Sequence, residues 1–528
     1  MGHPPTDPAV VYRYHDGTKH HFHRYAQSLG YLDWASQPKP FRSFSGAESL
    51  PLYPVPGVEA HGTGPAIGDV LRHALGLSAW KQHRASRWSL RVNPSSGNLH
   101  PTEAYIIAGP RTGLCSSPSV FHYAPDRHAL ERRCVFDDRQ RLVEDVWLVA
   151  LTSIHWREAW KYGERAFRYC QHDLGHAIAA LRIAAGLLGW AARLLPQFST
   201  ADLAALTGVD RDGDFVEAER EEPACVLAVG LEPAAARLAD NRAELVAAVR
   251  GGVWTGRASQ LSEDHVQWSF IDEIAEATFS HARGAPPPRA VAPRLRSSQR
   301  PQALSTPYDR RVILQRRSAV AFDGSSGTSR ERFLHILERA RPGPRAPWDA
   351  LWWSPRIHFA LFVHRVEGIE PGLYFLARDV SVIDRARAAM HREFLWTPVH
   401  DNALFCLARG DCRALSARLS CDQDIASDGF FSLGMIADFS ASLQEFGAPF
   451  YRELFWEAGA AGQVLYLEAE AAGARATGIG CFFDDPVHDL LGLAGHTFQS
   501  LYHFTIGMPV DDTRLTTEPG YAWEKPIV

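Results

Sequence analysis

The chain repeats one long pattern, and this repeat constrains its fold more than any other feature. An Ala-rich stretch, GHAIAALRIAAGLLGW, is followed by DLAALTGV and then by CVLAVGLEP. The same order returns later as GQVLYLEAEAAGARATGIG, HDLLGL and YHFTIGMP. Three pairs of glycines align at offsets of 287, 284 and 277 residues: Gly175 with Gly462, Gly208 with Gly492, and Gly230 with Gly507. Such offsets are far longer than a solenoid period of about 20–50 residues and indicate duplication of a whole domain.

The repeat predicts four regions along the chain. Residues 1–60, rich in His, Arg, Tyr, Trp and Pro, are expected to form an extended N-terminal arm that packs on a neighbouring part. The first domain covers 61–281 and includes a C-terminal helical extension. A Pro- and Arg-rich linker without hydrophobic periodicity follows at 282–304, and the second domain covers 305–528. In both domains helices alternate with short β-branched or aromatic runs, which favours an α+β fold with helices on a mixed sheet.

Composition excludes several classes of partner. The 55 basic and 60 acidic residues give no net field for nucleic acid or acidic lipid. The most apolar predicted helix, 177–195, is interrupted by Arg182 and Arg193 and is too polar to cross a bilayer. None of the eight cysteines forms Cys-x-x-Cys, so the spacing suggests neither a zinc ribbon nor a dithiol redox pair. The first residues lack the apolar core of a signal peptide. We therefore predict a soluble cytoplasmic protein without nucleic-acid or membrane partners.

A polar loop in the first domain is the first candidate site. The sequence NPSSGNLHP brings Pro94, Ser95, Ser96, Gly97 and Asn98 together on a tight backbone. Such a loop can present N–H groups and an amide to an anion or a planar heterocycle. The alternative is a Ser- and Asn-rich turn that caps the next helix.

A basic segment in the second domain is the second candidate. Arg316, Arg317 and Ser318 stand at the end of a predicted helix. Two guanidinium groups beside a hydroxyl suit a phosphate, because each can donate two parallel hydrogen bonds. The alternative is a solvated basic helix end that interacts favourably with the helix dipole.

These segments resemble parts of the nitroreductase family of FMN enzymes. NPSSGNLHP is similar to the flavin-contacting loop of that family, Arg-Arg-Ser to its phosphate-binding motif, and GIGCFF with TIGMP to its C-terminal half. WKYGERAFRYCQHDLGHA and the N-terminal YHDGTKHHFHRY resemble the tandem members of the SagB-type dehydrogenases, the azoline-oxidising branch. The resemblance implies an α+β fold in which two fused nitroreductase-like domains form a pseudo-dimer, with helices packed on mixed β-sheets.

The resemblance also implies a composite cofactor site, because enzymes of this family are typically homodimers with FMN at the interface. The first copy keeps the Pro-Ser loop but lacks an Arg-Arg-Ser element, and the second copy shows the reverse. We therefore expect one complete FMN site, one degenerate site and no bound metal. The cofactor-binding residues implied by the resemblance are Arg316, Arg317, Ser318, Pro94, Ser95, Ser96, Asn98, Gly478, Ile479, Gly480 and Arg514.

Lys161 and Tyr162 are the catalytic candidates. At the repeat offset they fall opposite residues 448–449, an Ala-Pro pair, whereas the nearby Arg165 matches Arg452. A tyrosine of ordinary pKa about 10 becomes a usable base when an adjacent ammonium favours its phenolate. Lys161 could supply that charge, or act as the base itself if desolvated. The alternative is a solvent-facing lysine beside a core tyrosine.

A pair of histidines offers a weaker metal signal. His172 and His176 are spaced i, i+4 on a predicted helix, which could bind a metal. The Glu of a His-Glu-x-x-His motif is missing, and His176 matches Gln463 in the repeat. A packing or interface role is therefore favoured.

The leading functional prediction is an FMN-dependent SagB-type dehydrogenase. It would oxidise an azoline-like or related small-molecule or modified-peptide substrate by hydride transfer to flavin, with NAD(P)H or O2 as redox partner. One alternative is an NAD(P)H-dependent nitroreductase or quinone reductase. Another is a non-catalytic flavin-binding partner of a peptide-modifying complex. The sequence fixes neither the substrate nor the direction of the redox reaction.

Overall fold

The computed structural model describes residues 8–52, 64–110, 114–137, 146–230, 241–283 and 306–524. We refer to 8–283 as the first half and 306–524 as the second half. The predicted linker at 282–304 lies outside the described residues, apart from Ala282 and Arg283. Among the described helices, none combines the length and apolar character that crossing a membrane requires.

The first half contains one large antiparallel sheet with the strand order β11-β7-β6-β5-β8-β10-β9, and β2 also pairs with β7. Its strands are β2 (Glu48–Pro51), β5 (Thr102–Ala108), β6 (Ser119–Ala124), β7 (Ala129–Val135), β8 (Val146–Ser153), β9 (Ala191–Leu194), β10 (Glu222–Gly230) and β11 (Val253–Trp254). Its helices are α1 (Pro8–Gly17), α2 (Gly64–Ala74), α3 (His155–Tyr162), α4 (Ala166–Gly186), α5 (Thr200–Thr207), α7 (Arg242–Arg250) and α8 (Ser269–Ala277).

The second half has a sheet of the order β15-β16-β14-β13-β17-β19-β18. Its strands are β13 (Ile357–Val363), β14 (Gly372–Leu376), β15 (Thr397–His400), β16 (Leu404–Arg409), β17 (Phe431–Asp438), β18 (Arg475–Ile479) and β19 (Phe498–Gly507). Its helices are α9 (Arg310–Gln315), α10 (Arg330–Ala340), α11 (Ile383–Ala389), α12 (Arg413–Leu419), α13 (Ile425–Asp428), α14 (Phe439–Phe446), α15 (Phe450–Ala471) and α16 (Asp484–Leu491).

The two sheets share one topology. Six strands occupy the same places in both, so β7-β6-β5-β8-β10-β9 corresponds to β16-β14-β13-β17-β19-β18. The strands beside β7 and β16 differ, because β11 follows β10 in the chain whereas β15 precedes β16, and β2 adds a further pairing to β7. The glycine pairs also hold: α5 and α16 end at Gly208 and Gly492, both left-handed with φ of 74° and 76°, and β10 and β19 end at Gly230 and Gly507. The predicted fused pseudo-dimer is confirmed.

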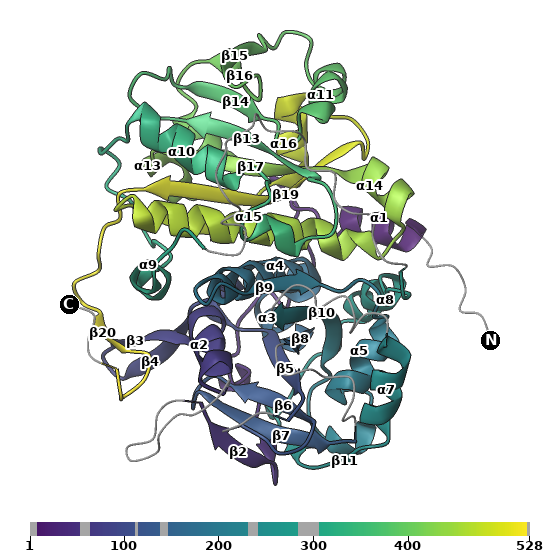
Figure 1. Ribbon diagram of the computed structural model, residues 1–528. Coiled ribbons are helices and arrows are strands. Elements are labelled where there is room, and N and C mark those ends of the chain that lie inside the picture. Colours follow the sequence, from purple (N-terminus) through teal and green to yellow (C-terminus); the bar gives the residue numbers. More distant parts are fainter. Residues whose placement is uncertain are drawn as a thin grey trace, which may run out of the picture.

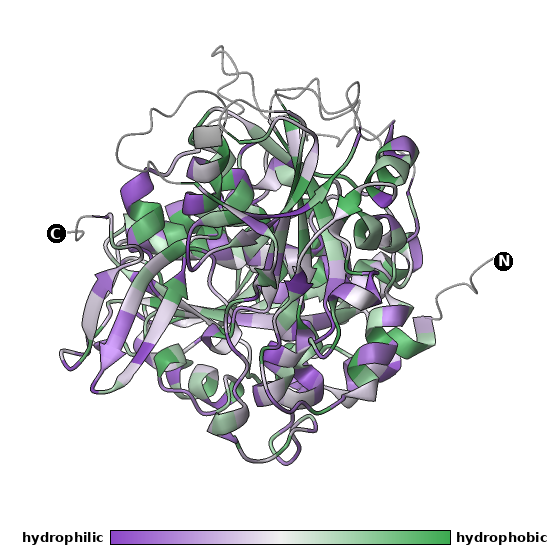
Figure 2. Cartoon of the chain, turned by 90° about the horizontal axis from the view of Figure 1, so that it is seen from below, coloured by the Kyte–Doolittle hydropathy of each residue, from purple (hydrophilic) through white to green (hydrophobic). Residues whose placement is uncertain are grey.

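One detail of the predicted sheets needs refinement. Every pairing between named strands in the described ranges is antiparallel, and parallel pairing is limited to isolated bridges of Ser318 with Ala476 and Thr328 with Val366. Figure 2 shows apolar residues concentrated on the central strands and polar ones toward outer segments. The α+β class is confirmed, with sheets that are essentially antiparallel.

The long helices α4 and α15 form the contact between the halves, and they lie side by side across the middle of Figure 1. All of α4 is buried, which suits a helix that is apolar on most of its surface. A Cβ on Gly175 would lie 2.3 Å from the carbonyl oxygen of Trp456, and one on Gly459 would lie 2.1 Å from that of His172. Glycine is therefore required where the two backbones cross.

The described part of the N-terminal arm, 8–52, starts with a helix rather than an extended segment. In α1, Val11, Tyr14 and His15 are buried, at the i, i+3, i+4 spacing of one helix face. The arm crosses to the second half, where the His15 imidazole lies 2.9 Å from the Gln499 amide oxygen and His496 pairs with Asp16 at 2.9 Å. Its residues 53–60 lie outside the described ranges.

The end of the chain makes the reverse crossing. The strand β20 (Thr516–Pro519) pairs with β3 (Leu77–His83), which forms a hairpin with β4 (Ser86–Arg91). In Figure 1 this three-stranded sheet projects at the side of the first half, beside the C-terminus. Each half therefore contributes a terminal segment to the other.

Candidate functional site

A cleft of about 960 Å³ lies between the two halves. The first half contributes the loop 94–98 with residues of the β3–β4 hairpin and of α4. The second half contributes residues 315–318, 475–481 and most of 510–519. The next cavities in the described part of the chain measure about 10 to 30 Å³ each. The structure thus brings together segments that lie about four hundred residues apart in sequence.

The predicted polar loop lies on one wall of this cleft. Pro94, Ser95, Ser96 and Asn98 all line it. A short 3-10 helix, η2 (Ser96–Asn98), turns the chain, with φ of 56° at Gly97 and 60° at Asn98. The Asn98 amide donates to the Ser89 carbonyl at 2.8 Å, so one of its groups already serves the hairpin. The Ser95 hydroxyl contacts the His100 ring at 3.1 Å.

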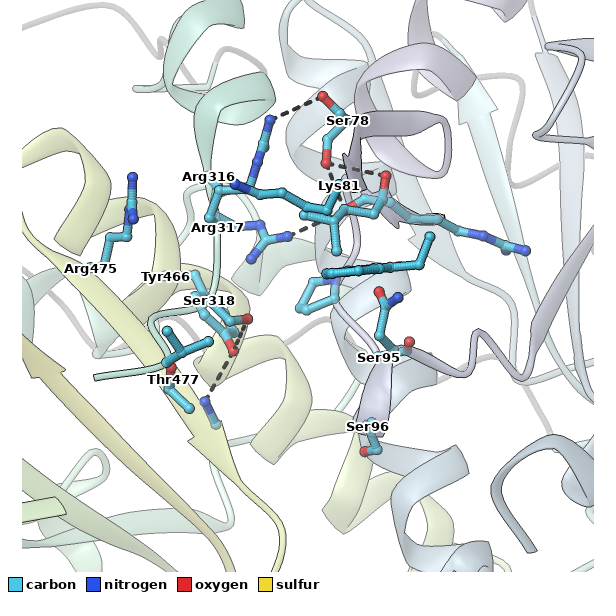
Figure 3. A pocket seen from close by; sticks show the side chains of 18 of the residues that line it. Ser78, Lys81, Ser95, Ser96, Arg316, Arg317, Ser318, Tyr466, Arg475 and Thr477 are labelled. Carbon is cyan, nitrogen blue, oxygen red and sulfur yellow. Dashed lines mark hydrogen bonds between the residues drawn. The ribbon is translucent and has the colours of Figure 1, made fainter. Parts of the chain in front are cut away.

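The Arg-Arg-Ser segment lies across the cleft from that loop (Figure 3). The buried Arg316 donates to the carbonyls of Val92 and Arg91 at 3.2 Å, and its Nη1 is buried without a partner among the described residues. Arg317 donates to the Ser78 carbonyl at 3.1 Å. Burial, and next the charge of Arg316, lower the pKa of Arg317 to about 10, so it remains cationic at neutral pH.

Ser318 and Gly478 of β18 both contact Tyr466. The Ser318 hydroxyl lies 2.9 Å from the Tyr466 hydroxyl, which also accepts from the Gly478 N–H at 3.0 Å. Gly478, Ile479 and Gly480 all line the cleft. A Cβ on Gly478 would lie 2.0 Å from the Tyr502 hydroxyl, and one on Gly480 would lie 2.4 Å from the Tyr169 ring. Close packing against these rings therefore demands glycine at both positions.

The structure separates the two catalytic candidates. Tyr162 lines the cleft and lies close to Gly97, where a Cβ would be 2.6 Å from its hydroxyl oxygen. Lys161 is not among the lining residues, and its Nζ lies 5.3 Å from the centre of the Tyr162 ring. Burial, and then the charge of Glu158, hold the pKa of Tyr162 well above its ordinary value. The environment thus opposes the phenolate that we expected Lys161 to favour.

Arg514 stands between Thr513 and Leu515, which line the cleft, but its own side chain does not line it. The Arg514 side chain is 74% exposed, and it pairs with Asp512 at 2.7 Å. Arg514 and Asp512 are two residues apart in a surface turn, which allows this local pairing. The resemblance used to assign Arg514 does not predict it. The position therefore gives no support to a phosphate-binding role.

Several lining residues were missed by sequence reasoning. Lys81 and Arg475 add positive charge beside Arg317, and Figure 3 shows all three around the same part of the cleft. Burial, and then the charges of Arg317 and Arg475, lower the pKa of Lys81. Lys81 comes from a hairpin and Arg475 begins β18, and neither stands in a recognisable motif. No sequence signal marks them.

Asp173 was also missed, although the repeat contains a signal for it. At the offset of 287 residues it falls opposite Ala460, so the charge occurs only once. It lines the cleft and accepts from the Ser96 backbone N–H at 3.0 Å and from the Ser96 hydroxyl at 3.1 Å. Burial holds the pKa of Asp173 well above its ordinary value, and burial together with the Asp173 charge does the same for Glu158. The two carboxyl groups therefore hold protons more tightly than exposed carboxyl groups do.

The paired histidines behave as packing residues. The His176 ring contacts the Gln463 amide oxygen at 3.3 Å across the α4–α15 crossing, which joins the two positions matched by the repeat. The His172 ring stacks on Tyr502 with the ring centres 4.1 Å apart. The one group of potential metal ligands found among the described residues lies elsewhere, at His20, Cys421 and Cys481.

Comparisons with known proteins agree with this architecture. Residues 313–508 match the model of the nitroreductase family. No curated protein matches the chain. A solved structure from Anabaena variabilis, assigned as a nitroreductase, superposes with a TM-score of 0.68 at 20% identity, over 95% of this chain and 99% of that one. This similarity establishes a nitroreductase-like fold across both halves.

Two further structures are similar over smaller parts. The E. coli microcin synthetase McbBCD complex gives a TM-score of 0.30 at 17% identity, over 48% of this chain and 85% of that one. The NADPH:FMN oxidoreductase from Vibrio harveyi gives 0.23 at 14% identity, over 38% of this chain and 68% of that one.

Proposed function

We propose that the cleft binds one FMN per chain and that the protein is an FMN-dependent oxidoreductase. The observation that carries this proposal is the meeting of the two half-motifs: the loop 94–98 and the segment 316–318 come from different halves and line one cleft. Three other cavities among the described residues have volumes of only about 10 to 30 Å³ each. We also propose that the protein works in a reducing compartment.

The lining residues suit the shape and charge of this cofactor. Ligand pockets commonly have volumes of about 300–1,000 Å³, a range that includes this cleft. Lys81, Arg317 and Arg475 supply positive charge for the phosphate, and the buried Nη1 of Arg316 is a donor without a partner among the described residues. Gly478 and Gly480 line the cleft, and the rings of Tyr502 and Tyr169 pack against them. When bound, FMN would supply a two-electron acceptor for hydride.

The residues at the other end of the cleft would handle protons and position the substrate. Tyr162 would act as a protonated hydroxyl that donates a hydrogen bond, because its raised pKa keeps it neutral. Asp173 and Glu158 would hold a proton beside Ser96. Lys161 would act indirectly, since its charge lowers the pKa of Glu158. These roles replace the phenolate base expected from sequence.

Within this class we propose a SagB-type dehydrogenase that oxidises an azoline-like or related small or peptidic substrate. The support is the resemblance of the segment around Lys161 and Tyr162 and the placement of Tyr162 in the cleft. Anaerobic mixing with NADPH separates this proposal from a nitroreductase or quinone reductase. The flavin of a dedicated dehydrogenase should bleach slowly when NADPH is added, whereas rapid bleaching of the flavin would favour the reductase.

The first test is the cofactor stoichiometry of the purified protein, measured by heat release and chromatography of the flavin. One FMN per chain supports the single composite site. Two FMN per chain would require a second binding site. That result would contradict the inference that each half keeps the motif that the other half has lost. None, even after incubation with excess FMN, would favour a protein without flavin chemistry.

A further inference from the structure

Two cysteines far apart in sequence meet beside the cleft. Cys481 follows Gly480 and lines the cleft, and its Sγ lies 2.6 Å from the Sγ of Cys421. The other six cysteines are buried, whereas these two are partly exposed. The pair therefore combines close approach with access to solvent, which the buried cysteines lack.

The surrounding backbone holds the two segments together without help from the sulfur atoms. Cys421 stands in a turn just after α12, and both it and Asp422 are left-handed, with φ of 57° and 56°. The Gln423 amide donates to the carbonyls of Ser420 at 2.6 Å and Cys481 at 3.2 Å. A left-handed conformation is unfavourable for a residue other than glycine, so tertiary contacts must maintain this turn. The left-handed turn and the hydrogen bonds of Gln423 therefore position the two thiols.

The spacing favours a sulfur–sulfur bond over a metal site. His20 lies nearby, with its Nδ1 3.7 Å from the Cys481 Sγ, so the three groups could in principle hold zinc. Two thiolates on a tetrahedral zinc, at Zn–S of about 2.3 Å, stand about 3.8 Å apart. The observed 2.6 Å is closer to the S–S bond of about 2.05 Å.

We propose that Cys421 and Cys481 form a thiol–disulfide exchange site that reacts with small disulfides of the glutathione class. The Cys481 thiolate attacks one sulfur of the small disulfide, that S–S bond breaks, and the released thiolate takes up the proton that Cys481 lost. Cys481 then carries a mixed disulfide. Attack by the Cys421 thiolate on the Cys481 sulfur closes the protein disulfide and releases the second small thiol, which takes the Cys421 proton. The small disulfide gains two electrons and the dithiol loses two.

Exposure and charge assign the attacking role to Cys481. It faces the cleft, and contact with Cys421 and then the charge of Arg165 lower its pKa. The same contact, with burial, raises the pKa of Cys421. The thiol with the lower pKa supplies more thiolate at neutral pH and reacts first. Cys421 is the resolving thiol, and the step requires no flavin, so it stands apart from the proposed function.

Thiol counting on the full-length protein tests this site. The protein is reduced, freed of reductant, incubated with oxidised glutathione, denatured and labelled with a maleimide, and its mass is measured. Two of the eight thiols should escape labelling, a peptide map should join Cys421 to Cys481, and dithiothreitol should restore both. Eight labelled thiols, or a disulfide elsewhere, would overturn the proposal. So would one zinc per chain that protects these thiols until a chelator removes it.

Variants separate the two roles. Cys421→Ser should stop at a glutathione mixed disulfide on Cys481, because the resolving thiol is absent. Cys481→Ser should remain free of glutathione at Cys421. The matched control Cys412→Ser, at a buried cysteine, should lose the same two labels as the wild type. If a serine variant fails to fold, the count of labelled thiols and the peptide map of the wild-type protein still test the proposed exchange site.

Discussion

The two halves of the molecule have the same framework and different cleft-facing residues. Both have six strands in the same order and a long buried helix at the interface. Arg475 pairs with Gly507 at the end of β18, and its counterpart in the first half, paired with Gly230, is Ala191. Asp173 likewise has Ala460 as its counterpart. Positions that pack are alike, whereas positions that line the cleft differ.

This difference indicates how one site can be assembled from two copies. The glycine contacts of α4 and α15 require both copies to keep their backbones close. The charged lining of the cleft has no such requirement, because each residue is needed only once. The duplication therefore preserves the interface and leaves the binding residues free to differ between halves.

The largest expected effect tests the phosphate end of the cleft. Arg317→Ala should weaken FMN binding about 10- to 100-fold, because a hydrogen bond to a charged group contributes about 1.5–3 kcal/mol. Arg311→Ala, an exposed arginine on α9, is the matched control and should bind FMN like the wild type. Fluorescence titration of the protein freed of flavin measures both. Equal affinity in the two variants would contradict the assignment of Arg317.

The crossing of α4 and α15 should be sensitive to a small added side chain on either helix. Gly175→Ala and Gly459→Ala each place a Cβ against backbone, so each should lower the free energy of unfolding by about 1–3 kcal/mol. Gly343→Ala, with no atom within 4 Å, should leave stability nearly unchanged. Thermal unfolding followed by circular dichroism compares the three. A large loss from only one of the two variants would show that these two backbone approaches do not constrain the crossing equally.

A smaller effect concerns the unmatched carboxyl group at position 173. The pKa of Asp173 is raised in the folded protein, so the folded state binds its proton more tightly than the unfolded state does. Its contribution to stability is therefore greatest at low pH and is lost as pH rises above the ordinary value of 3.8.

Asp173→Asn should remove this pH dependence while keeping an oxygen for the Ser96 N–H. Between about pH 5 and about pH 8 the wild type should lose more stability than the variant. Urea unfolding midpoints at both pH values measure the difference. Asp264→Asn, at an exposed carboxyl group, should follow the wild type. Parallel behaviour of Asp173→Asn and the wild type would contradict the raised pKa.

The smallest expected effect is at Arg514. Because its side chain is exposed and pairs with Asp512, Arg514→Ala should leave FMN affinity unchanged. Arg475→Ala, at the start of β18, should weaken binding measurably, since this residue lines the cleft. A loss of affinity with Arg514→Ala would restore the role that the sequence assigned to it.

The sequence predicts the repeated framework well, because a glycine at a left-handed helix end or at a close helix crossing cannot be replaced without strain or a steric clash. Gly208 and Gly492 are of this kind, and their left-handed backbones match. It also places the loop 94–98 and the segment 316–318 at one cleft. The sequence does not predict the place of Lys81 in the cleft or the contact between Cys421 and Cys481, because only tertiary packing brings these residues to the site. The Tyr162 environment likewise depends on burial and on Glu158, which local spacing does not reveal.

The pairing of β20 with β3 affects how the halves respond to dilution. Two separate subunits with an interfacial site would dissociate as their concentration falls, and the site would disappear with the interface. Here the tail of the second half is a strand of a sheet in the first half. Covalent connection makes their association intramolecular, with an effective concentration independent of the amount of protein present. The integrity of the cleft should therefore be the same at nanomolar and at micromolar protein.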